Sequence, residues 1–234
     1  IAPDIRLTLH NSGHILGSSL THLHIGEGLH NVVYTSDYKY APTILLEPAV
    51  TVFPRVETII TESTYGAPGD LMPSRIEAEE RLASVINETL DRGGKVLIPV
   101  PAVGRAQEIM LIIDGYMRRG LMKEAPVFIE GMISEATAIH TAYPEYLARG
   151  VRNSILHEGI NPFQSDYFTT VEHPSAREEI VDGEQSIVIA TSGMLEGGPV
   201  IDYFKRLAHD KRNTIIFVSY QIEGTMGRRI QKGL

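Results

Sequence analysis

The chain has 234 residues, of which 43% are hydrophobic and 21% charged, with a net charge of −8 and no cysteine. This composition describes a globular protein with an ample core, and no apolar run approaches the roughly 20 residues that cross a bilayer. The absence of cysteine excludes disulfides and thiolate chemistry, so any metal must be held by His, Asp or Glu. The acidic balance argues against a protein that coats nucleic acid through bulk positive charge, but it leaves room for local phosphate binding.

The first 66 residues are predicted to be β-rich, with polar side chains where strands end. Alternating apolar and polar residues predict strands over 5–10, 20–25 and 31–35, and Gly26-Glu27-Gly28 is typical of a hairpin turn. A fourth strand, short and buried, is predicted over 58–61.

From residue 67 onward, strands that are apolar throughout alternate with amphipathic helices. A capping box of Ser74 and Glu77 starts the first helix, which ends at Gly93-Gly94. Strands are then predicted over 95–99, 127–130, 186–191 and 214–219. Helices are predicted over 106–117, from near Ser134, after Pro199 and from about Gly224, with short or irregular elements over 150–180. This alternation indicates an α/β domain whose parallel sheet is covered on both faces.

In such a sheet, ligands bind beyond the carboxyl ends of the strands. Residues with small or polar side chains follow several of these ends, where helix N-termini suit a phosphate-bearing substrate. They are Glu62, Pro99–Pro101, Glu130–Gly131, Thr191–Met194 and Ser219–Gln221. No Rossmann or Walker A motif is present, so a nucleotide cofactor is disfavoured.

Three residues near the N-terminus are candidates for chemistry. His14 in a glycine-flanked turn could bind a metal, Asp37 could bridge two metals, and Glu62 could be a ligand, an acid-base group or a partner of a histidine. Taken singly, each also fits an ordinary turn or strand-end residue.

Other polar and aromatic residues are assigned structural roles. His22 and His24 form an His-x-His pair on one strand face, but no Asp-His follows, so we expect exposed strand residues. The tyrosines are interpreted as packing residues.

Together, these motifs resemble the metallo-β-lactamase/β-CASP family of ribonucleases, in particular archaeal homologues of the endonuclease subunit of the cleavage and polyadenylation specificity factor. Gly13-His14-Ile15-Leu16-Gly17 and Thr35-Ser36-Asp37-Tyr38 resemble metal-binding motifs, with Ser36 in place of the usual glycine. Glu62-Ser63-Thr64-Tyr65-Gly66 resembles β-CASP motif A. The similarity continues in order through Gly93-Gly94, Ile98-Pro99, Gly104-Arg105-Ala106-Gln107-Glu108, Ser192-Gly193-Met194 and Glu223-Gly224-Thr225.

The resemblance implies a fold, a cofactor and a substrate. Residues 1–66 would be part of a β-rich metallo-β-lactamase core, and residues 67–234 a β-CASP domain with a parallel sheet flanked by helices. The intact protein would hold two zinc ions and hydrolyse single-stranded RNA, with His14 and Asp37 as metal ligands and Glu62 as a catalytic residue that orients a histidine. Arg105, Ser192 and Gly193 are weaker candidates for substrate contact. The resemblance also implies a cytoplasmic protein without a membrane anchor and allows a homodimer.

The family's His-x-His-x-Asp-His cluster and its last motifs are absent from these 234 residues. Both ends are therefore interpreted as cuts in a longer protein, and the fragment alone is expected to be inactive. Two alternatives stay open: a catalytically inactive β-CASP scaffold of an RNA-processing complex, and a metallo-hydrolase acting on small molecules. The long α/β segment after Glu62 disfavours the second alternative.

Overall fold

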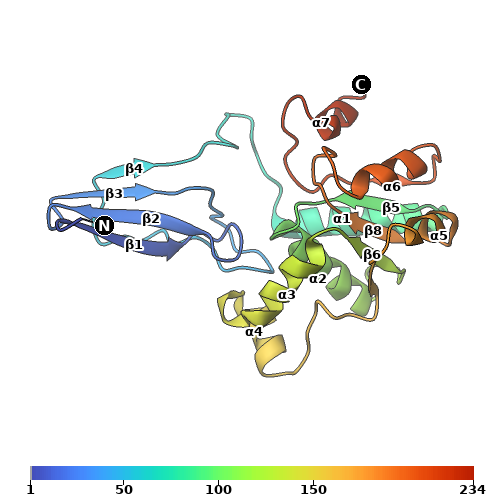
Figure 1. Ribbon diagram of the computed structural model, residues 1–234, viewed down its shortest axis with the longest axis horizontal. Helices are drawn as coiled ribbons and strands as arrows, with labels where there is room; N and C mark the ends of the chain where they lie inside the picture. The colour runs from blue at the N-terminus through green and yellow to red at the C-terminus, as the bar shows by residue number, and fades with distance from the viewer. Residues whose placement is uncertain (1) are drawn as a thin grey trace.

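The computed structural model describes residues 2–234, which form two separate sheets (Figure 1). The first sheet has four strands in chain order, and its strands are β1 (Ile5–Asn11), β2 (Ser19–Ile25), β3 (His30–Tyr34) and β4 (Thr58–Ile60). β1, β2 and β3 pair antiparallel, whereas β4 pairs parallel to β3 after the crossover over residues 35–57. The predicted hairpin between β2 and β3 is confirmed.

The second sheet has five parallel strands in the order β7-β6-β8-β5-β9. Its strands are β5 (Val96–Pro99), β6 (Val127–Glu130), β7 (Phe168–Thr170), β8 (Ile187–Ala190) and β9 (Thr214–Ile215). The surrounding helices are α1 (Arg75–Asp91), α2 (Arg105–Arg118), α3 (Ile133–Ala142), α4 (Arg149–Leu156), α5 (Ala176–Asp182), α6 (Val200–Leu207), α7 (Met226–Gln231) and the 3-10 turn η1 (Pro144–Tyr146). β5 and β8 are buried along their whole length because helices lie on both faces. The predicted α/β class is confirmed.

The capping box predicted for α1 is also present. The Ser74 hydroxyl accepts a hydrogen bond from the Glu77 N–H, and the Glu77 carboxylate accepts one from the Ser74 N–H at 2.8 Å. These two bonds satisfy N–H groups that the first helical turn leaves free.

Two strand predictions were partly wrong. β4 was expected to be buried, but Ile59 and Ile60 are 59% and 52% exposed. β4 pairs only with β3, and the helices gather around the second sheet (Figure 1). The last strand was expected over 214–219 but ends at Ile215, although the Ile216 N–H still donates to the Leu97 carbonyl.

One segment of the β3–β4 crossover joins the two parts of the molecule. The side chains of Leu45 and Leu46 are buried in the core around α1, α2 and the second sheet. The Glu108 carboxylate, on α2, accepts hydrogen bonds from the backbone N–H groups of Ile44 and Leu45 at 2.9 and 2.8 Å. The Leu45 carbonyl in turn accepts a bond from the Ala148 N–H. The first sheet is thus attached to the second through the backbone of a loop. The predicted domain boundary at residue 67 stays a prediction.

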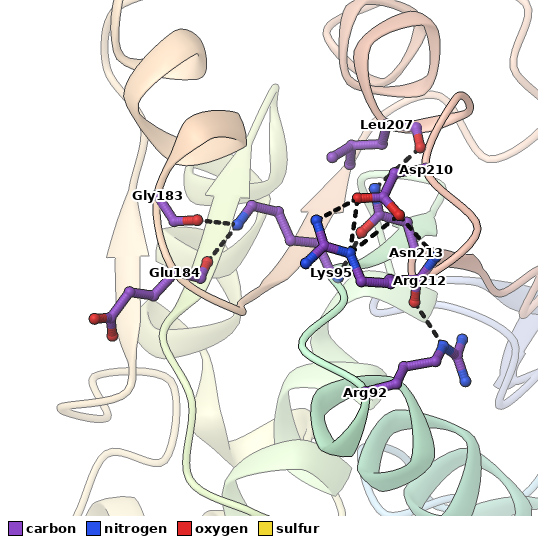
Figure 2. A network of polar contacts seen from close by, with 8 residues as sticks. All are labelled: Arg92, Lys95, Gly183, Glu184, Leu207, Asp210, Arg212 and Asn213. Atoms are coloured by element: carbon purple, nitrogen blue, oxygen red, sulfur yellow. Dashed lines mark hydrogen bonds and ion pairs between the residues drawn. The ribbon is translucent and has the colours of Figure 1, made fainter.

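A second polar network closes the amino-terminal end of β5 (Figure 2). The Lys95 ammonium is buried and donates to the backbone carbonyls of Gly183 and Glu184, just before β8. The Lys95 N–H donates to the Asn213 side chain at 2.7 Å, next to β9. One residue therefore ties β5 to the turns that lead into both neighbouring strands.

None of the helices in residues 2–234 combines the length and the hydrophobicity that a membrane span requires.

Glu108→Ala should weaken the attachment between the two parts. The substitution removes the acceptor of two backbone N–H groups, and a hydrogen bond to a charged group contributes about 1.5–3 kcal/mol. We expect the thermal midpoint to fall by roughly 3–10 °C and the amides of Ile44 and Leu45 to lose protection from hydrogen exchange. Glu135→Ala is the matched control, because Glu135 is exposed and has no polar partner within residues 2–234. Equal midpoints for the two variants would contradict this role of Glu108.

Lys95→Met should destabilise the second sheet. Methionine keeps the apolar stem but removes the charged donor of the hydrogen bonds to the Gly183 and Glu184 carbonyls, and a hydrogen bond from a charged group contributes about 1.5–3 kcal/mol. The measurement is the denaturant midpoint, with Lys211→Met, an exposed lysine in the same network region, as control. If Lys95→Met unfolds at the same midpoint as the control, the carbonyls must be satisfied in another way.

Candidate functional site

The first sheet brings His14, Asp37 and Glu62 to one end. His14 lies in the turn between β1 and β2, Asp37 follows the end of β3, and Glu62 follows the end of β4. His14 Nε2 lies 3.8 Å from Asp37 Oδ2. Glu62 is close enough to His14 for the two side chains to interact electrostatically. The three residues predicted from separate motifs therefore converge on one site.

The turn that carries His14 requires glycine at residue 13. Gly13 has a φ of +67°, and a Cβ there would lie 2.8 Å from the Ala49 nitrogen and 2.9 Å from the Glu47 carbonyl oxygen. Both distances are shorter than real Cβ contacts. The close approach of the turn to residues 47–49 thus fixes the backbone that carries His14.

Ser36 forms a sharp turn just before Asp37. Its φ is +51°, in the left-handed region that glycine adopts without steric cost, which fits the glycine that the resemblance led us to expect at this position. The Thr35 hydroxyl donates to the Ser36 carbonyl at 2.8 Å. The chain therefore makes this turn with a serine.

Glu62 is held as a carboxylate. Its pKa lies below the ordinary value because the side chain and backbone N–H of Thr64 donate hydrogen bonds to it, with smaller contributions from the Tyr38 N–H and His14. The bond from the Thr64 N–H is 2.9 Å long. An ionised Glu62 is suited to accept a hydrogen bond from a histidine and poorly suited to act as a general acid near neutral pH.

His14 and Asp37 fit as two ligands of a zinc ion. The imidazole nitrogen and the carboxylate oxygen face each other, and the side chains are 47% and 70% exposed, so an incoming ion can reach both. Zinc in proteins takes four or more donors. Among residues 2–234, no group of three or more His, Asp or Glu side chains is placed to hold a metal ion. These residues can therefore supply only part of a metal site.

Arg105 lies beside the His14 turn. Gly104, which precedes α2, has a φ of +80°, and a Cβ there would lie 2.8 Å from Ile15 Cγ2. Arg105 is exposed, and its guanidinium has no polar partner in the described part of the chain. This position suits the predicted phosphate contact, which stays a prediction.

Ser192 and Gly193 lie in the loop after β8 and have structural contacts there. The Ser192 hydroxyl accepts a bond from the Glu196 N–H at 3.1 Å. Gly193 packs on Pro101, which would lie 2.7 Å from an added Cβ, and the Gly193 carbonyl accepts a bond from the Gln221 side chain. These contacts give both residues a structural role, and their predicted contact with substrate stays a prediction.

The structure pairs two tyrosines that the sequence motifs do not connect. The Tyr65 and Tyr220 rings meet edge to face, with centroids 5.8 Å apart, and the side chains are 48% and 46% exposed. Neither is the packing residue that was expected. Tyr220 lies in the segment 219–221 that was named as a ligand position, and Tyr65 in the motif of Glu62, but nothing in the sequence indicates that their rings meet.

The expectation that His22 is exposed was wrong. His22 lies on the same strand face as His24, as predicted, but it is only 1% exposed. Phe53, in the β3–β4 crossover, packs edge-on against its ring and against that of His10. Burial, followed by the nearby His24 and His10, lowers the pKa of His22 below its ordinary value near 6.5.

The His22 pKa predicts loss of stability in acid. Because the folded-state pKa is depressed, His22 is neutral in both states and has no effect on stability well above about pH 6.5. As the pH falls from there toward the folded-state pKa, protons bind the unfolded chain more readily and destabilise the fold. We expect the free energy of unfolding to decrease between about pH 7.5 and about pH 5.5 and the slope to be smaller in His22→Gln. His173→Gln, at an exposed histidine, should keep the full slope. An unchanged slope in His22→Gln would show that His22 is protonated equally in both states.

The chain is similar to known proteins over its whole length. A family model described as the Beta-Casp domain matches residues 106–230, which is more than half of the chain. The chain is 61% identical to transcription termination factor FttA of Thermococcus kodakarensis, 59% to that of Methanothermobacter thermautotrophicus and 57% to that of Methanocaldococcus jannaschii. Each match covers 100% of this chain but only 36% or 37% of the relative. The five-stranded parallel sheet, its flanking helices and the match over residues 106–230 show that the chain belongs to the Beta-Casp domain family.

Proposed function

We propose that this chain supplies part of the active site, and one wall of the RNA cleft, of a zinc-dependent ribonuclease. The observation that carries the proposal is the convergence of His14, Asp37 and Glu62 at one end of the first sheet. The relatives named transcription termination factors are compatible with RNA as the molecule acted on. The reaction would be hydrolysis of phosphodiester bonds in RNA 3′-end processing or decay.

Each residue of the site would have a separate task. His14 would bind one zinc ion through Nε2, and Asp37 would bridge two ions with its two carboxylate oxygens. Zinc ions in such a pair polarise the phosphoryl group and activate a water molecule. Glu62, ionised through its Thr64 hydrogen bonds, would orient a histidine that protonates the leaving group.

The remaining metal donors and that histidine would come from other parts of the whole protein. The chain spans little more than a third of its relatives' length. Those relatives therefore contain further residues that could supply the missing donors. The fragment alone would be inactive. Single-stranded RNA as the substrate, Arg105 as a phosphate contact, a homodimer of the intact protein and a cytoplasmic location also belong to the proposal.

A catalytically inactive scaffold is the second candidate function. The lack, among residues 2–234, of any group of three side chains that could hold a metal is compatible with a scaffold as well as with a site completed by other parts of the protein. In that case the Beta-Casp domain would serve assembly of an RNA-processing complex rather than cleavage.

The test compares zinc content and cleavage of single-stranded RNA in the whole protein, in Asp37→Ala and in His14→Ala. We expect about two zinc ions per wild-type chain and a loss of zinc in both variants. Substituting a residue that only hydrogen-bonds to a metal ligand typically lowers activity by roughly 10–100-fold. We expect the cleavage rates of these two variants to fall by more than that, because they remove ligands themselves. Asp166→Ala is the matched control, since Asp166 is exposed and lies in the loop before β7. If the wild-type protein contains no zinc and does not cleave RNA, the nuclease proposal is wrong and the scaffold function takes its place.

A further inference from the structure

Tyr65 and Tyr220 form an exposed aromatic pair where the two parts of the molecule meet. Tyr65 belongs to the segment between β4 and α1, and Tyr220 to the segment between β9 and α7. Their ring planes are 88° apart, so the edge of one ring faces the plane of the other. Almost half of each side chain remains exposed.

Neither tyrosine is used elsewhere in the described part of the chain. The two rings contact each other and no other aromatic ring, no cation lies over either of them, and neither hydroxyl has a hydrogen-bond partner within residues 2–234. Exposed aromatic surface of this kind is costly in water and is typical of binding sites.

The backbone beneath both rings is held in place. On one side, the Glu62 carboxylate accepts the Thr64 N–H, and the Gly66 N–H donates to the Ser63 carbonyl at 3.0 Å. On the other side, the buried Gln221 side chain donates to the carbonyls of Gly193 and Ser219 at 3.0 and 3.1 Å. A base that stacks on the exposed face of either ring loses little free energy in ordering that ring.

The position of the pair relates it to the candidate site. Tyr65 is three residues from Glu62 and on the same tight turn. Tyr220 is joined through Gln221 to the loop after β8, at the carboxyl end of the second sheet. The pair therefore lies beside the place where the proposed reaction would occur.

We propose that Tyr65 and Tyr220 form an aromatic clamp for single-stranded RNA beside Glu62, in which a base stacks on an exposed ring face outside the edge-to-face contact, since rings with centroids 5.8 Å apart leave no room for a base between them. Aromatic side chains bind the flat face of any base, whereas bases in a duplex are already stacked and unavailable. A chain with a net charge of −8 gains little from general attraction to phosphates, so contact with uncharged base surface is the favourable alternative. The clamp rests on the proposed function and adds how the substrate strand is held.

The clamp is tested in the whole protein with Asp37→Ala present, so that bound RNA is not cut. The probe is a short single-stranded oligoadenylate that carries fluorescent 2-aminopurine. Tyr65→Leu and Tyr220→Leu should each weaken binding by about 5- to 100-fold, while Tyr65→Phe, which keeps the ring, should bind normally. Tyr146→Leu is the matched control, because Tyr146 is 67% exposed on η1, outside the pair.

Two further readings separate stacking from other effects. The fluorescence of 2-aminopurine should be quenched on binding to the parent protein and less so in the leucine variants. The slope of log affinity against log salt should stay unchanged in the leucine variants, since stacking releases no counterions, whereas Arg105→Ala should reduce it by about one if Arg105 contacts a phosphate.

Failure of the clamp and failure of the proposed function give different results. If the wild-type protein cuts RNA but both leucine variants bind and quench like their parent, the clamp is wrong and the nuclease stands. If the wild-type protein does not cut RNA but the leucine variants bind it more weakly, the clamp stands without the nuclease. If Tyr65→Phe weakens RNA binding as much as Tyr65→Leu does, stacking is also wrong, because phenylalanine retains the aromatic ring.

Discussion

The arrangement of the molecule depends on one carboxylate. Glu108 accepts the backbone N–H groups of Ile44 and Leu45 and thereby holds the β3–β4 crossover on α2. Backbone donors that enter a core must be paired, and this segment enters it because Leu45 and Leu46 are buried there. The polar bond and the apolar burial support each other, and together they attach the first sheet to the second.

That attachment has consequences for the candidate site. The same crossover continues into residues 47–49, against which Gly13 packs so closely that no side chain fits. The His14 turn is therefore positioned by the loop that Glu108 anchors, and Gly104 meets Ile15 on its other side. The same crossover therefore both positions the His14 turn and attaches the first sheet to the second, and it does so through a few backbone contacts.

The charges of the site differ from those of the molecule as a whole. The chain is acidic, and Asp37 and Glu62 add further negative charge where we propose that an RNA strand binds. Metal ions would compensate that charge, since bound cations are often the largest local charges in a site. The aromatic pair Tyr65 and Tyr220 fits the same logic, because stacking gains affinity without positive charge on the protein.

Much of the fold could be predicted from the sequence because it depends on local patterns. The capping box of α1, the glycine-bounded helix ends and the apolar strands of the second sheet reflect periodicity and backbone preference. His14, Asp37 and Glu62 could be named as candidates, since their motifs resemble those of the family and each lies beyond the end of a predicted strand. Strand direction alone then places them at one end of the sheet.

The tertiary structure decided what depends on contacts between distant residues. His22 is buried because Phe53, some 30 residues away, folds over it, and β4 is exposed because it pairs on only one side. Tyr65 and Tyr220 meet although they lie far apart in the chain. The sequence by itself determined the elements, the family and the chemical groups. Only the packing of segments distant in sequence determined which of those groups are buried and which face one another, because burial and contact belong to the assembled chain rather than to any local stretch of it.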